Sequence, residues 1–159
     1  SIQAEGCVGG DLRGGVGGDL NGFVQGDLRG SVAGNLHGVL NGVLAGVVGG
    51  YLVGEVRGDV CGAIGGNVYG GVQGDMRGTI LGNLNGTIRG DLSGNVQGNL
   101  AGKVLGDVMG VIHGNVSGMV MGDVREILGD IQAGAVIKGD VGRLHGVNYG
   151  QVSGDIGRR

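Results

Sequence analysis

The chain has 159 residues, of which 44 are glycine and none is proline, so it is not a collagen, because collagen combines glycine at every third position with abundant proline. Recurrent Val, Leu and Ile argue against a disordered chain. A net charge of −3 with dispersed Lys and Arg gives no electrostatic reason to expect a nucleic-acid partner.

Residues 6–125 form one uninterrupted repeat of four residues. Glycine occupies every fourth position from Gly6 to Gly122, thirty times in succession. Val, Leu, Ile or Met follows two residues after each of these glycines, from Val8 to Val124. The unit is therefore G-x-Φ-x, in which Φ is aliphatic. A period this strict predicts a repeat architecture rather than an ordinary globular core.

A longer period lies within the tetrapeptide. Asp or Asn follows every second glycine from position 11 to position 123, and only Val43 and Tyr51 interrupt the series. Between Asp59 and Asp123 the slot alternates between Asp and Asn, which gives a period of sixteen residues. We interpret sixteen residues as one turn of the structure.

These periods predict an all-β fold. In extended chain Gly and Φ point to one side and both x positions point to the other. Thirty glycines would cost a helix about 30 kcal/mol relative to alanine. We therefore expect a β-solenoid, that is a parallel β-helix of tetrapeptide sides with about 16 residues per coil. Φ would fill the axis, and glycine would sit at corners where backbones crowd. An intertwined trimeric β-helix is an alternative that the same octapeptides suit.

The repeat fails once, over residues 126–141, "EILGDIQAGAVIKGDV". Glu126 stands where a glycine is due, and two glycine spacings lengthen to five residues before a short spacing restores the phase. We expect one irregular coil here, followed by resumed repeats over residues 142–157, where Asn148 occupies an aliphatic slot.

A sixteen-residue coil stacks acidic residues in one column. The structural interpretation is a solvated column whose side chains bond to turn amides. A calcium-binding ladder is a weaker hypothesis for the residues Asp59, Asp75, Asp91, Asp107 and Asp123.

No arrangement of residues predicts an enzyme. His37, His113 and His145 lie far apart in the sequence, and no Ser-His-Asp or paired-carboxylate pattern stands out. We expect no catalytic residue, no cofactor and no other metal site.

Outward apolar residues are candidates for self-association, because apolar patches on a rod favour packing against another chain. The candidates are Val39, Val43, Val47, Tyr51, Val53, Met109, Val111, Met119 and Met121. The uncharged run 38–54 has small-xxx-small spacing, as transmembrane interfaces do, but the tetrapeptide continues through it, so we do not expect membrane insertion.

Runs such as "GNLNGTIRGDLSGNVQGNLAGKVLGDV" (82–108) resemble the Gly-Asp/Asn-Val-x tetrapeptide shafts of bacteriophage tail fibres and spikes. The chain is more distantly similar to pentapeptide-repeat proteins and to bactofilins, which are polymerising bacterial β-helices. These resemblances imply a structural fibre protein, extracellular or on a virion or fibre surface. Such a rod would form a filament, or the shaft of a phage-type fibre, by end-to-end or lateral association with itself. The alternative is a binding or adhesion module whose variable outer face contacts glycans or a cell surface.

Overall fold

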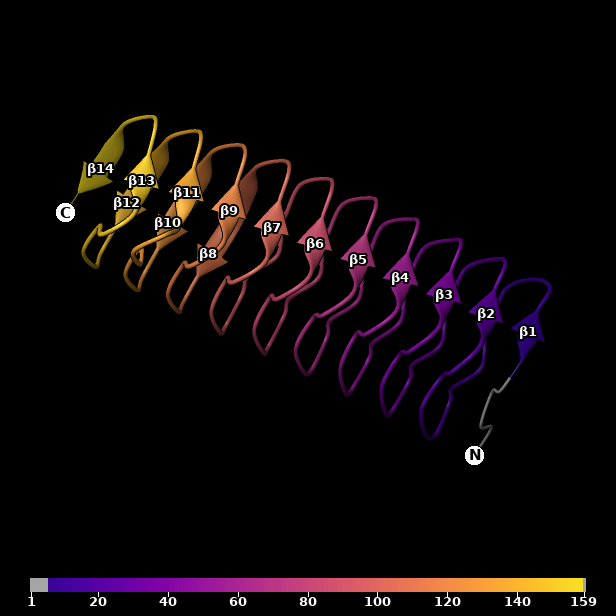
Figure 1. Cartoon of the computed structure of the whole chain (residues 1–159). Coiled ribbons are helices and arrows are strands. Elements are labelled where there is room, and N and C mark those ends of the chain that lie inside the picture. Colours follow the sequence, from indigo (N-terminus) through magenta and orange to yellow (C-terminus); the bar gives the residue numbers. More distant parts are fainter. Residues whose placement is uncertain (1–5, 159) are drawn as a thin grey trace.

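The computed structural model describes residues 6–158 and shows a parallel β-solenoid. The chain winds from one end of a rod to the other, and each coil lies directly on the one before it (Figure 1). About nine coil-to-coil steps separate the first strand from the last strand of the longest sheet. At a strand spacing of ~4.8 Å these steps give a rod about 43 Å long.

The strands are short because each side of a coil is only one tetrapeptide long. They are β1 (Cys7–Val8), β2 (Phe23–Val24), β3 (Val39–Leu40), β4 (Glu55–Val56), β5 (Gly71–Val72), β6 (Thr87–Ile88), β7 (Lys103–Val104), β8 (Val108–Ile112), β9 (Met119–Val120), β10 (Val124–Ile127), β11 (Val136–Ile137), β12 (Val141–Leu144), β13 (Gln151–Val152) and β14 (Ile156–Arg158).

The stacking register confirms the sixteen-residue coil. One parallel sheet has ten strands in the order β1-β2-β3-β4-β5-β6-β7-β9-β11-β13, and a second has four in the order β14-β12-β10-β8. In the longer sheet Val8 pairs with Val24, sixteen residues on. The other sides of the coil are joined by isolated parallel bridges with the same step, such as Leu12 to Leu28.

The aliphatic slots fill the axis of the rod, as the repeat predicts. Every Φ residue from Val16 to Val124 is at most 2% exposed, and no polar or charged side chain of the described residues is buried. Four columns of Val, Leu, Ile and Met thus run along the coils as one continuous core. Burial of aliphatic side chains at ~1.5–3 kcal/mol each is the main stabilising contribution.

The glycines are required by the closeness of the coils and not by an unusual backbone conformation. Of the described residues only Gly6 and Gly134 have a positive φ. A Cβ on Gly74 would lie 2.8 Å from the carbonyl carbon of Gly58 and still closer to Oδ1 of Asp59, both in the preceding coil. A side chain at such a corner would therefore force the coils apart.

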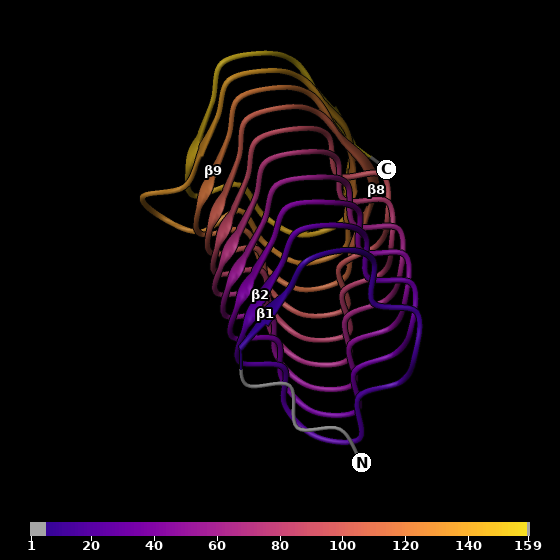
Figure 2. The ribbon, with the colours of Figure 1, turned by 90° about the vertical axis from the view of Figure 1, so that its right-hand side faces the viewer.

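The irregular segment is one coil whose step changes and then recovers. The spacing between stacked residues falls to 15 from Val116 to Ile131 and rises to 17 from Ile131 to Asn148, so the original phase returns. Residues 132–135 form a turn, with Gly134 at φ +90° and the N–H of Ala135 donating to the carbonyl of Gln132. This turn projects from the side of the rod as the orange loop in Figure 2.

The intertwined three-chain alternative does not describe this structure. The partners of each interior coil are the coils before and after it in the same chain, as in the bonds Leu12 N–H to Asp27 C=O and Arg29 N–H to Leu12 C=O. A single chain therefore closes its own core.

Candidate functional site

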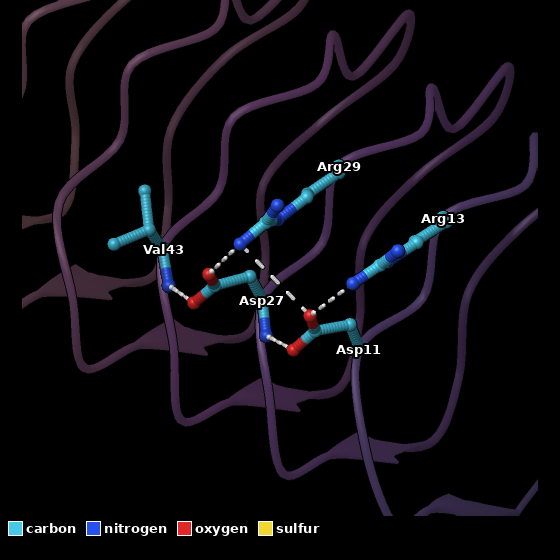
Figure 3. Close-up of polar contacts among 5 residues, drawn as sticks. All are labelled: Asp11, Arg13, Asp27, Arg29 and Val43. Atoms are coloured by element: carbon cyan, nitrogen blue, oxygen red, sulfur yellow. Dashed lines mark hydrogen bonds and ion pairs between the residues drawn. The ribbon is translucent and has the colours of Figure 1, made fainter.

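The acidic column is a hydrogen-bonded ladder that runs along the rod. Oδ1 of Asp11 accepts the N–H of Asp27 at 3.0 Å, and Oδ1 of Asp27 accepts the N–H of Val43 at 2.8 Å (Figure 3). The same bond recurs from Asp59 to Asp155 in the later coils. Each carboxylate thus accepts the backbone N–H of the equivalent residue in the next coil.

A second ladder uses mainly asparagine. Oδ1 of Asn83 accepts the N–H of Asn99, and Oδ1 of Asn99 accepts the N–H of Asn115, both at 2.8 Å. Amide and carboxylate serve equally here, because only one side-chain oxygen takes part. This requirement explains why the sequence admits either Asp or Asn at the slot and little else.

Coil 39–54 interrupts both ladders. Val43 and Tyr51 stand in the two slots, and each still donates its N–H to the coil before, to Asp27 and Asn35 respectively. Neither side chain offers an Oδ1 to the coil after it. This coil is therefore held to the next one by backbone bonds, by core packing and by the contact of the Tyr51 ring with Tyr69.

Arginine two residues beyond some of the aspartates neutralises part of the column. Arg29 lies 3.3 Å from Asp27 and 4.0 Å from Asp11, and Arg77 lies 3.5 Å from Asp59. The N–H of Val43 and the guanidinium of Arg29 lower the pKa of Asp27. Because the arginines are more than half exposed, water screens these ion pairs and they contribute little to stability.

The five aspartates considered for calcium all belong to the ladder, with Oδ1 turned toward the next coil. Within residues 6–158, no group of three or more His, Cys, Asp and Glu side chains is placed to hold a metal ion. The calcium ladder stays a hypothesis.

The candidate self-association residues are distributed around the rod and do not form one face. Val39 and Met119 lie in the ten-stranded sheet five coils apart, whereas Val43 and Tyr51 occupy the two ladder columns. More than 40% of the side chain is exposed at Val47, Tyr51, Val53, Met109 and Met121, while Val39, Val43, Val111 and Met119 are half-buried.

A tyrosine pair escaped the sequence reasoning. The rings of Tyr51 and Tyr69 pack edge to face with centroids 5.8 Å apart, and Nδ2 of Asn67 donates to the Tyr69 hydroxyl at 2.8 Å. The eighteen-residue separation, one coil plus two residues, was the available signal.

The sequence also did not predict a cluster of charged side chains, which includes Glu126 of the irregular coil. Nε2 of His145 is 2.7 Å from Oε1 of Glu126, and Arg143 is 3.8 Å from the same oxygen. The hydrogen bond from His145, followed by the nearby arginines, lowers the pKa of Glu126. Glu126 fits a glycine slot because β10 shifts register against β8 between Val124 and Glu126.

The first and last described coils carry core residues that are only partly buried. Val8 and Leu12 at one end, and Val152 and Ile156 at the other, are partly exposed members of the core columns. No helix of residues 6–158 has the length and apolarity needed to cross a membrane. Comparison with known proteins found no matching family model, no matching curated protein and no matching solved structure.

Proposed function

We propose that this chain is a structural fibre protein, a rod that extends a filament or the shaft of a fibre by association with copies of itself. A structural role outside the cell, on a virion or on a fibre surface, is proposed in place of an enzymatic one. Its resemblance to phage shafts supports that location.

One observation carries the proposal: a single aliphatic core and a single stacking step run through the regular coils of the described rod. Every aliphatic slot from Val16 to Val124 is buried, and each interior coil binds its two neighbours by the same parallel pairing. A repeat of this kind lengthens a rod by adding identical units, without any change in its core.

Electron microscopy of the purified chain, together with light scattering over a range of concentrations, tests the proposal. We expect linear particles one solenoid wide that lengthen with concentration and give a layer line at ~4.8 Å. Discrete trimers would favour a shaft built by lateral association. A single chain at every concentration would contradict the fibre proposal.

The Tyr51–Tyr69 pair favours a second candidate, a binding or adhesion module. Tyr51 and Tyr69 are 46% and 50% exposed, and Tyr69 bonds to Asn67. Exposed aromatic rings with a neighbouring amide offer a sugar both an apolar face and a hydrogen-bonding group. An oligosaccharide array probed with the parent chain and with Tyr69→Ala tests it. Binding that persists in the variant, or no binding by the parent, would count against this site.

A further inference from the structure

Two neighbouring sides of the rod carry opposite charges over the same four coils, residues 87–142. The first, called the basic side, is formed by β6, β7, β9 and β11, and its charged residues are Arg89, Lys103 and Lys138, all exposed. The second, called the acidic side, follows it in each coil. Its ladder residues in these coils are Asp91, Asp107, Asp123 and Asp140.

Within residues 6–158 these cations and carboxylates form no ion pairs, either with one another or with other side chains. An earlier part of the acidic column differs, because Arg77 lies 3.5 Å from Asp59 and 3.6 Å from Asp75. Arg125 stands at the position of Arg77 three coils later, but it lies outside ion-pair distance of the column and instead helps to lower the pKa of Glu126. Both sides therefore keep charges that a partner can neutralise.

The acidic side is hollowed by a groove of about 340 Å³ whose lining is mainly apolar. Gly142 helps to open the groove, because it stands where the two preceding coils carry Met109 and Arg125. A cavity of ~150 Å³ holds a benzene molecule, so this groove has room for apolar side chains. The residues that line it include Asp107, Met109, Asp123, Arg125, Asp140 and Gly142.

The basic side is raised at the level where the acidic side is hollowed. Leu105 and Met121 occupy the two middle coils of the basic side and are 45% and 44% exposed. Arg89 lies one coil before Leu105 and Lys138 lies one coil after Met121, so two apolar side chains stand between two cations. On the acidic side the groove lies among the carboxylates of the same coils. The two surfaces thus match in shape and are opposite in charge.

We propose that the basic side of one copy packs against the acidic side of a second copy, with the two rods parallel and equivalent coils at the same level. This contact rests on the proposed function and specifies how its fibres join side by side. The apolar side chains of the basic side enter the groove. At its rim, Lys103 faces Asp107 of the second copy and Lys138 faces Asp140 of the second copy.

Charge selects this arrangement over the others that two rods could adopt. Two basic sides or two acidic sides would bring like charges together, which is costly. Antiparallel rods would bring Lys103 to the level of Arg125, again a like charge, whereas parallel rods place Met119 and Met121 at that level. Because the sides in contact are unlike, each added copy leaves one side of each kind free, and association continues beyond a pair.

The size and charge of the contact predict when the rods will join. Four coils at ~4.8 Å and a side of ~13 Å cover roughly 250 Å², well below the ~800 Å² per partner of a stable interface. Two single rods therefore bind weakly, but a filament repeats the contact in every chain and gains avidity. The ionic rim is screened over ~3 Å at 1 M salt and over ~30 Å at 0.01 M. We expect single filaments at high salt and bundles of parallel filaments at low salt.

The double variant Asp107→Asn/Asp123→Asn tests the contact, and Asp59→Asn/Asp75→Asn is its matched control. Both remove two charges from the same column, and both keep the Oδ1 that accepts the N–H of the next coil. The control residues already pair with Arg77. In electron micrographs at about 0.01 M salt, the parent and the control should form bundles, whereas the test variant should give filaments one rod wide. Lys103→Glu, which leaves the ladder intact, should also abolish the bundles.

Zero-length cross-linking identifies the residues in contact and does not require filaments. A carbodiimide joins an amine to a carboxylate that touches it, and an equal mixture of ¹⁵N-labelled and unlabelled chains distinguishes links between chains from links within one chain. At low salt we expect links between chains from Lys103 to Asp107 and from Lys138 to Asp140. These links should disappear at about 1 M salt.

Each other outcome overturns the contact. Bundles of Asp107→Asn/Asp123→Asn as wide as those of the parent would place the lateral contact on another side of the rod. Links between chains from Lys138 to Asp91 would indicate antiparallel rods. Filaments of the parent that lengthen but never widen, with no links between chains, would exclude side-by-side packing and leave the fibre function standing. A parent that remains a single chain under all conditions would refute the proposed function itself.

Discussion

Two adjacent glycines, Gly70 and Gly71, test the physical basis of the repeat. A Cβ on Gly70 would lie 2.8 Å from the carbonyl carbon of Gly54 and 2.9 Å from the carbonyl oxygen of Val53. A Cβ on Gly71 would have only the Cγ of Glu55 at 3.9 Å and the carbonyl of Thr87 at 4.0 Å. Gly70→Ala and Gly71→Ala therefore add the same methyl group to one corner, in crowded and in open surroundings.

The expected cost of Gly70→Ala follows from how far the coils must separate. Carbon atoms in contact are ~3.5–4.0 Å apart, and the carbonyl oxygen of Gly54 lies still closer to this Cβ than its carbon does, so the corner must open by at least about 1 Å. The N–H groups of Tyr69 and Gly70, which donate to the carbonyl of Leu52 at 2.8 and 3.1 Å, would then lose that acceptor. The loss of two hydrogen bonds, the cost of leaving their buried partners unsatisfied and the overpacking of the corner together should lower the free energy of unfolding by about 3–5 kcal/mol.

Gly71→Ala should change the free energy of unfolding in the opposite direction and stabilise the fold. Its backbone needs no positive φ, so alanine mainly restricts the unfolded chain and stabilises the fold by about 0.4–1 kcal/mol. Urea unfolding followed by circular dichroism measures both variants, and Gly70→Ala should also melt roughly 6–20 °C below the parent. Equal midpoints for the two variants would refute the argument that coil spacing is what demands glycine.

Two further predictions concern side chains on the outer face. Asp91→Ala should lower the free energy of unfolding by about 1 kcal/mol, because Oδ1 of Asp91 accepts the N–H of Asp107. Asp91→Asn keeps that oxygen and should leave the urea midpoint unchanged. Equal losses of stability in both variants would mean that the charge of Asp91 matters and not its acceptor oxygen. The hydrogen bond with His145 lowers the pKa of Glu126 in the folded chain, so the stability that ionised Glu126 contributes is present above pH 4.5 and is lost as acid protonates it. The free energy of unfolding, measured from pH 6 to pH 3, should therefore fall less steeply in Glu126→Gln than in the parent. Parallel curves for the two proteins would contradict the pairing with His145.

The sequence was sufficient for the coil and its core because both depend on strict periods. The alternation of Asp and Asn from Asp59 to Asp123 marked the sixteen-residue step that the pairs Leu12–Leu28 and Val8–Val24 show. The aliphatic slots, read as axial, are the buried ones.

What sequence reasoning missed depends on direction and on neighbours across coils. The turn-bonding expectation placed the oxygen of Asp or Asn within its own turn, but Oδ1 of Asn83 reaches the N–H of the next coil. The repeat pattern alone does not show toward which neighbouring coil a side chain points. The Glu126–His145 contact depends on a shift of strand register. The unequal glycine spacings of residues 126–141 indicate that such a shift occurs, but they do not show which side chains it brings together.

The backbone hydrogen bonds that join the coils link residues 14 to 18 positions apart, and none of the strand pairings joins distant parts of the described chain. Because every coil contacts only its neighbours in sequence, the rod can fold one coil at a time, and each folded coil is the template for the next sixteen residues. During synthesis, a coil is complete soon after its last residue leaves the ribosome, without waiting for the C-terminus. The exposed edge of each newly folded coil therefore serves as the template for the next coil of the same chain.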